Sequence, residues 1–97
     1  MGIQKKSVDI TFDPAKGARN LTDRGLDFAL ASEVFANRTA EIEDTRREYG
    51  ERRFITAGML AGRIVVIVWT PRNGSRRIIS MRFAHEREQA LWRQLIG

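Results

Sequence analysis

Three runs of β-branched and apolar residues follow one another in the second half of the chain, and only short turns separate them. The runs span residues 54–60, 63–70 and 76–83, joined by Ala61-Gly62 and by a segment that contains Asn73-Gly74. Connections this short join neighbouring antiparallel strands, whereas parallel strands need a crossover of a dozen or more residues. The longest apolar stretch within them is far shorter than the roughly 20 residues that cross a bilayer. The pattern therefore predicts an antiparallel sheet with buried strands and no membrane span.

Two helices are predicted in the first half of the chain. Asp13 stands directly before a proline, which predicts the N-cap and first position of a helix over residues 14–24. Gly25 supplies the left-handed residue at which that helix ends. Asp27 predicts the cap of a second helix over residues 28–36, whose apolar side chains recur every three or four positions.

Further strand and helix patterns lie on either side of these segments. Residues 8–12 and 39–44 alternate apolar and polar side chains, as half-buried strands do, and residues 84–96 have helical spacing. The predicted fold is α+β, in the order β-α-α-β-β-β-β-α. It has an antiparallel sheet of about four to five strands, two N-terminal helices and one C-terminal helix.

Length and composition predict one domain over residues 1–97. The chain is 42% hydrophobic, which is enough for one compact core. It contains no cysteine, which fits a reducing compartment, and no apolar stretch follows Lys5 and Lys6 as a signal peptide requires. We therefore expect a cytoplasmic protein with no membrane partner.

Positive charge is concentrated in the second half of the chain. Residues 1–50 hold 8 Lys/Arg and 9 Asp/Glu, whereas residues 51–97 hold 9 arginines and 3 glutamates. Arginine binds phosphate through a planar fork, whereas lysine offers a point charge. The distribution favours a polyanionic partner such as RNA; the alternative is a solubilising surface with structural ion pairs.

One strand predicts a polar surface that suits RNA. Strict alternation places Arg76, Ser80 and Arg82 on one face of the strand over residues 76–83. Trp69, on the neighbouring strand, is a candidate for stacking on a base. The alternatives are that Trp69 belongs to the core and that Arg77 makes a structural ion pair.

Few residues are suited to proton transfer. RNA cleavage without a metal needs a base for the ribose hydroxyl, cations for the charge that develops on phosphorus, and an acid for the leaving oxygen. His85 is the single histidine, and Lys16 and Glu51 are further candidates; each is as easily a helix cap or an exposed ion-pair partner. A carboxylate metal site near Glu41 and Glu43 lacks residues to complete it, so no metal or cofactor is expected.

Several separated motifs resemble the BrnT toxin family between about residues 10 and 92. They are Phe12-Asp13-x-x-Lys16 with Asn20, Gly25-Leu26-x-Phe28-x-x-Ala31-x-x-Val34-Phe35, Glu43-Asp44-x-Arg46-x-x-Tyr49-Gly50-Glu51-x-Arg53, Gly58, and Arg77-Ile78-Ile79-Ser80-x-Arg82-x-Ala84-x-x-x-Glu88. The resemblance implies a fold similar to RelE-type, microbial ribonucleases. It also implies metal-independent RNA cleavage that arrests growth. The implied partner is a BrnA-type antitoxin that neutralises the toxin in a heterotetramer and binds operator DNA.

Residues and resemblance together give one set of candidates. The catalytic candidates are Lys16, Glu51, Arg53, Arg77, Arg82 and His85, with the base left open, and the RNA-binding candidates are Phe12, Asp13, Trp69, Arg72 and Arg76.

The chain departs from the family pattern at three places. Phe12 replaces tryptophan, Asp23-Arg24 replaces Lys-His, and Phe83 replaces a basic residue. The consequence is altered substrate handling, weakened toxicity or no effect. The alternative function is a module without catalysis that binds nucleic acid or the antitoxin.

Overall fold

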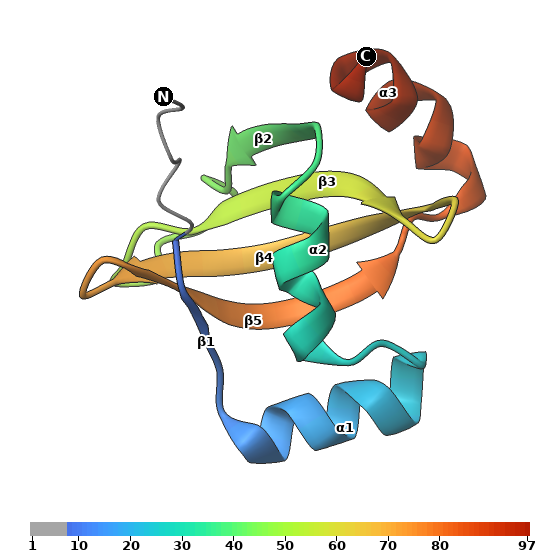
Figure 1. Cartoon of the computed structure of the whole chain (residues 1–97). Coiled ribbons are helices and arrows are strands. Elements are labelled where there is room, and N and C mark those ends of the chain that lie inside the picture. Colours follow the sequence, from blue (N-terminus) through green and yellow to red (C-terminus); the bar gives the residue numbers. More distant parts are fainter. Residues whose placement is uncertain (1–7) are drawn as a thin grey trace, which may run out of the picture.

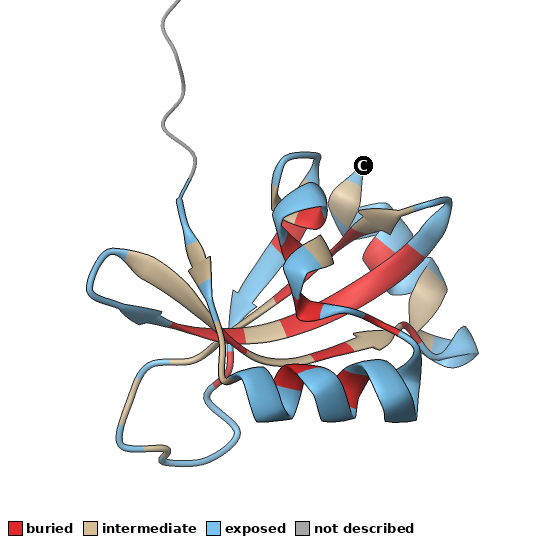
Figure 2. Ribbon diagram, turned by 60° about the horizontal axis from the view of Figure 1, so that its bottom comes forward, coloured by how far each residue is buried: buried red, intermediate tan, exposed pale blue. Residues whose placement is uncertain are grey.

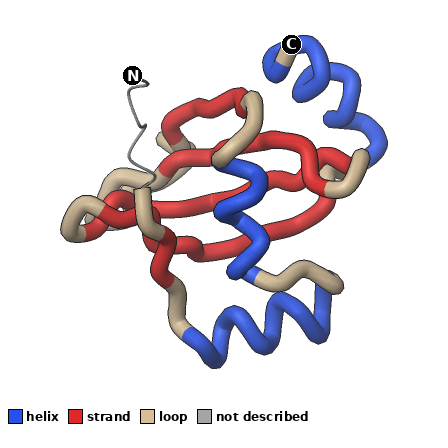
Figure 3. The backbone as a smooth tube through the Cα atoms, viewed as in Figure 1, coloured by secondary structure: helices blue, strands red, loops and turns tan. Residues whose placement is uncertain are grey.

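A computed structural model describes residues 8–97 as a five-stranded sheet with helices on both faces (Figures 1 and 3). The elements are β1 (Ile10–Thr11), α1 (Pro14–Arg24), the 3-10 turn η1 (Phe28–Leu30), α2 (Ala31–Phe35), β2 (Thr39–Glu43), β3 (Phe54–Leu60), β4 (Arg63–Arg72), β5 (Ser75–Phe83) and α3 (Glu86–Ile96). The strand order is β1-β5-β4-β3-β2. The predicted α+β class and the distribution of helices are confirmed. The expectation for the segment with Lys5 and Lys6 lies outside the described residues.

Strand β4 is the central strand of the sheet, and its side chains are buried on both faces. Val65, Ile67 and Trp69 belong to the core cluster under η1 and α2, whereas Ile64 and Val66 belong to a second cluster with Trp92 of α3. A strand covered on both faces reads as a nearly continuous apolar run. Figure 2 shows the buried residues where helices and sheet meet.

The sheet is mixed, so the prediction of a purely antiparallel sheet is wrong for its first strand. Strand β1 is only two residues long and pairs in parallel with β5, Ile10 opposite Arg76 and Thr11 opposite Arg77. The strand ends early because Asp13 caps α1: its carboxylate accepts a hydrogen bond of 2.9 Å from the Ala15 N–H. This short pairing sets the first turn of α1 beside the beginning of β5.

Strict alternation along β5 is also wrong. The register places Val68 opposite Ser80 but Trp69 opposite Ile78, so Ile79 is an extra residue in a β-bulge. A bulge reverses the facing of all residues on one side of it relative to the other. Arg76 therefore lies on the face of Trp69, and Arg82 on the opposite face.

The remaining caps match the sequence patterns closely. Gly25 ends α1 with φ of 72°, and the Asp27 carboxylate accepts a hydrogen bond from the Ala29 N–H. The last helix begins two residues later than predicted, because His85 is its N-cap. No helix within residues 8–97 has the length and apolar character needed to cross a membrane.

Candidate active site

A polar pocket of about 270 Å³ lies where β1, the first turn of α1 and the adjoining ends of β4 and β5 meet the segment that enters β3. Basic and acidic side chains from distant parts of the sequence line this pocket. Its lining residues are Asp13, Lys16, Glu51, Arg53, Thr70, Arg72, Arg77, Ile78 and Ile79. We call it the arginine pocket.

Four segments supply these side chains: the capped start of α1, the segment that enters β3, the end of β4 and the beginning of β5. Asp13 and Lys16 come from the capped start of α1, and β1 holds that start beside Arg77 through the pairing of Thr11 with Arg77. On the other side of β5, Thr70 of β4 is the cross-strand partner of Arg77. The pocket is thus assembled across the edge of the sheet at which β1 joins it.

The electrostatics of the pocket favour an anion. It contains four cationic side chains and two carboxylates. Glu51 accepts a hydrogen bond of 3.1 Å from Arg53 Nε and lies 3.6 Å from Arg72 Nη2. Lys16 and Arg77 have no ion-pair partner among residues 8–97. Lys16 and Arg77 are therefore available to a ligand. Arg53 and Arg72 hold the Glu51 carboxylate in place.

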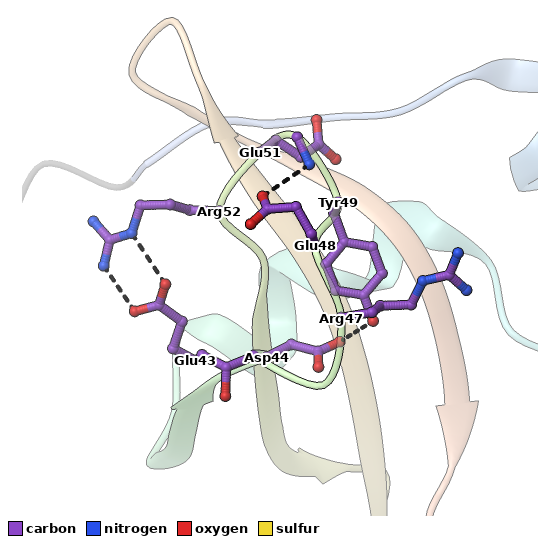
Figure 4. A pocket seen from close by; sticks show the side chains of 9 residues that line it. Glu43, Asp44, Arg47, Glu48, Tyr49, Glu51 and Arg52 are labelled. Carbon is purple, nitrogen blue, oxygen red and sulfur yellow. Dashed lines mark hydrogen bonds and ion pairs between the residues drawn. The ribbon is translucent and has the colours of Figure 1, made fainter.

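The loop over residues 44–53 positions Glu51 and is held by a buried carboxylate (Figure 4). The Asp44 side chain is 1% exposed and accepts hydrogen bonds from Arg46 Nε and Nη2, both 2.8 Å, and from the Tyr49 hydroxyl at 3.1 Å. The Arg46 guanidinium is the main cause that holds the pKa of Asp44 well below its usual range. Arg53 lies over the Tyr49 ring, 4.1 Å from its centroid. The Asp44 network is thus linked through Tyr49 to Arg53, the arginine that pairs with Glu51.

A second tie joins the loop to the sheet. The Thr70 hydroxyl, on buried strand β4, donates a hydrogen bond of 2.6 Å to the Arg52 carbonyl. This contact fixes the backbone between Glu51 and Arg53 at the pocket wall. The sequence analysis did not include Thr70, Ile78 or Ile79 among the candidates. Thr70 follows Trp69 directly, and Ile78 and Ile79 belong to the family motif that begins at Arg77, which were the signals that could have identified them.

Two predicted catalytic residues lie away from the arginine pocket. Arg82 donates hydrogen bonds of 2.6 and 3.3 Å to the Glu88 carboxylate and so joins β5 to α3. His85 caps α3, and its backbone N–H donates to Glu88 at 3.1 Å. Arg82 is the first cause that lowers the pKa of Glu88. The structure thus places Arg82 on β5 and His85 at the start of α3, where both contact Glu88.

Three predicted RNA-binding residues lie in or against the core. Trp69 is 8% exposed, and its Nε1 donates a hydrogen bond of 2.8 Å to Thr56. Phe12 packs edge-on against Phe28, with ring centroids 5.5 Å apart. The Arg76 guanidinium lies over the rings of Phe35 and Trp69. Asp13 and Arg72, by contrast, line the arginine pocket.

The carboxylates near β2 have separate partners. Glu41 accepts a hydrogen bond from Thr56, Glu43 pairs with Arg52, and Asp44 pairs with Arg46. In the part of the chain that the structure describes, no three His, Asp or Glu side chains gather as metal ligands.

The arrangement of the arginine pocket is suited to binding a phosphate beside a carboxylate. The sequence pattern of the family described as "Ribonuclease toxin, BrnT, of type II toxin-antitoxin system" matches residues 12–88, which include every residue of the arginine pocket. No individual curated protein matches the chain. The match spans most of the chain, and the protein belongs to the BrnT family of ribonuclease toxins of type II toxin-antitoxin systems.

Proposed function

We propose that this toxin cleaves RNA in the arginine pocket without a metal ion, through attack of a ribose 2′-hydroxyl on the adjacent phosphorus. The observation that carries the proposal is the convergence of four cationic side chains around a held carboxylate in one pocket. Family membership supports a ribonuclease, and the pocket supplies groups that this chemistry requires.

The cations bind the scissile phosphate and stabilise the charge that develops on its oxygens. Arg77 and Lys16, which have no ion-pair partner among residues 8–97, make the direct contacts. Arg53 and Arg72 orient the carboxylate and add to the positive potential. Fixed cations aimed at developing charge typically contribute about 10²- to 10³-fold each to the rate.

Glu51 and Lys16 perform the two proton transfers in this proposal. The Glu51 carboxylate takes the proton of the 2′-hydroxyl as the 2′-oxygen bonds to phosphorus. The bond from phosphorus to the 5′-oxygen then breaks, and the Lys16 ammonium gives a proton to that oxygen. The products are a 2′,3′-cyclic phosphate and a 5′-hydroxyl end, so atoms and charges balance. Glu51 is the base because it is the carboxylate held between two arginines, whereas Asp13 caps a helix.

Two arginines of the same strand provide a matched test. Arg77→Ala removes a pocket cation, whereas Arg82→Ala removes one that pairs with α3. In EDTA, Arg77→Ala should lower the rate of RNA cleavage about 10²- to 10³-fold, and Arg82→Ala should retain it when both proteins are folded. Binding of RNA without cleavage by the wild-type chain would favour the alternative, a binding module.

The antitoxin partner is a BrnA-type protein in this proposal. Membership of a type II toxin-antitoxin family supports a protein antitoxin. The toxin and antitoxin form a heterotetramer in which the antitoxin contacts operator DNA. A co-purified complex of two toxin and two antitoxin chains that has lost RNA cleavage would support this assembly, and a complex that still cleaves RNA would contradict neutralisation by binding.

A further inference from the structure

A second groove, of about 220 Å³, continues from the arginine pocket between α1 and β5. It shares Lys16 and Ile79 with that pocket. Strand β1 pairs only with the beginning of β5, and α1 runs along β5 beyond that pairing (Figure 1). The groove is lined by Lys16, Arg19, Asn20, Asp23, Arg24, Phe28, Ile79 and Ser80. We call it the helix groove.

The α1 wall of the helix groove carries an excess of positive charge. Lys16, Arg19 and Arg24 follow one another along α1, all three line the groove, and all are exposed. None has an ion-pair partner among residues 8–97, and Asp23 is the one acidic residue of the lining. At 1.5 Å per residue, this row of cations extends for about 12 Å, which is more than the distance between adjacent phosphates of a strand.

The β5 wall supplies a different surface. Ile79 is the bulged residue of β5, and it is half-buried where the two cavities meet. Bulges re-aim side chains and are frequent next to active sites. Phe28 lies at the base of the groove and is buried. Sites for single-stranded nucleic acid typically place cations beside a surface that the bases contact, because phosphates and bases lie on opposite sides of the strand. In the helix groove the half-buried Ile79 supplies the accessible apolar contact, whereas Phe28 is buried beneath it.

We propose that the helix groove holds the nucleotides next to the scissile phosphate, with Arg19 and Arg24 bound to the phosphates of a single-stranded RNA. The proposal rests on cleavage in the arginine pocket, since Lys16 belongs to both cavities. It defines the substrate class as an unpaired strand that extends beyond the cleaved bond. Arg19 and Arg24 are binding residues that take no part in the proton transfers.

Binding of a non-cleavable RNA tests this groove independently of catalysis. The probe is a single-stranded 2′-O-methyl RNA octamer, titrated by fluorescence anisotropy at several salt concentrations. The test variant is Arg19→Ala with Arg24→Ala. The control is Arg87→Ala with Arg93→Ala, which removes two exposed arginines of α3; Arg24 and Arg93 each lie in the last turn of their helix.

The test variant should raise the Kd for the octamer at least 10-fold. The slope of log K against log salt should become shallower by about 0.7 for each lost phosphate contact. The control should bind within 2- to 3-fold of the wild type, because Arg87 and Arg93 lie on α3 and do not line the helix groove. The control and the test variant have the same net charge, so a difference between them is not an effect of total charge. With cleavable RNA, the test variant should raise KM and leave kcat unchanged.

Equal loss of binding in the test and control variants would overturn the proposal, because it would show a general effect of charge. A test variant that binds RNA as the wild type does but binds the antitoxin more weakly would also overturn the proposal. It would show that the groove binds the antitoxin. Absence of octamer binding by the wild-type chain would overturn it as well. If only the test variant loses octamer binding and the wild-type chain does not cleave RNA, the result would support RNA binding in the helix groove and refute the proposed ribonuclease step.

Discussion

Replacement of Asp44 by alanine should destabilise the fold and release the loop that carries Glu51. The carboxylate is buried and accepts four hydrogen bonds: from the Arg46 backbone N–H, from two guanidinium nitrogens of Arg46 and from the Tyr49 hydroxyl. Alanine leaves all these donors without their acceptor. The matched control is Glu43→Ala, which removes a similar two-point pair with Arg52 from an exposed position.

The magnitude follows from the exposure of each donor. The hydroxyl and the backbone N–H contribute about 1 kcal/mol each to the free energy of unfolding. The guanidinium bonds add about 0.5 kcal/mol together, because the Arg46 side chain is 71% exposed and water screens it. The expected loss of 2–3 kcal/mol corresponds to a Tm lower by about 10–15 °C in a domain of this size.

Thermal unfolding followed by circular dichroism measures this loss. Asp44→Ala should lower Tm by the stated amount, and Glu43→Ala should leave it close to the wild-type value. RNA cleavage by Asp44→Ala should also fall at a temperature where the variant is still folded, since Asp44 no longer holds the loop that carries Glu51. Equal Tm values for Asp44→Ala and the wild type, or equal losses in both variants, would show that burial of the Asp44 carboxylate adds no stability.

Three further predictions concern packing, pH and the link to α3. Gly58→Ala should lower the free energy of unfolding by about 1–3 kcal/mol in a denaturant titration, because its Cβ would lie 2.8 Å from a methyl group of buried Val34; a value at or above wild type would contradict this packing. The pKa of Asp44 is depressed, so its contribution to stability is complete above its unfolded value of about 3.9 and is lost as the pH falls through the folded value. The stability difference between the wild type and Asp44→Asn should therefore be constant above about pH 5 and shrink as the pH falls below 4; a difference that grows on acidification would contradict the sign. Arg82→Ala breaks the ion pair with α3 and should lower Tm while kcat stays within a few-fold of wild type; loss of cleavage in a folded variant would place Arg82 in the site.

Local patterns were sufficient to predict most elements of the fold. The caps of α1 and η1 depend on Asp13 and Asp27, whose side chains act within two residues of their own position. The strands over residues 54–83 follow from alternation and short turns, which are equally local. Such features need no knowledge of the rest of the chain.

Features that depend on strand pairing were not predictable from these patterns. The parallel pairing of β1 joins residues 10–11 to residues 76–77, and the bulge at Ile79 is visible only once β4 and β5 are in register. The bulge is the reason that Arg76 and Arg82 lie on opposite faces, where alternation predicts one face. Burial of Trp69 likewise depends on the helices that cover its side of the sheet.

The composition of the arginine pocket has the same origin. Asp13, Glu51 and Arg77 are separated by up to 64 residues in sequence, and no periodic pattern groups them. The family resemblance named these positions as candidates. The structure shows that six of the eleven candidates line one pocket, whereas Arg82 lies on β5 and pairs with Glu88, and His85 caps α3.

Cleavage of a defined single-stranded RNA in EDTA, with chemical identification of the product ends, tests whether the arginine pocket cleaves RNA without a metal ion. The wild-type chain should leave 2′,3′-cyclic phosphate and 5′-hydroxyl ends, and folded Glu51→Gln should cleave about 10²- to 10⁴-fold more slowly. Cleavage that requires a divalent cation, or products with 5′-phosphate ends, would contradict metal-free attack by the 2′-hydroxyl. A Glu51→Gln variant that cleaves at the wild-type rate would contradict the role of Glu51 as the base.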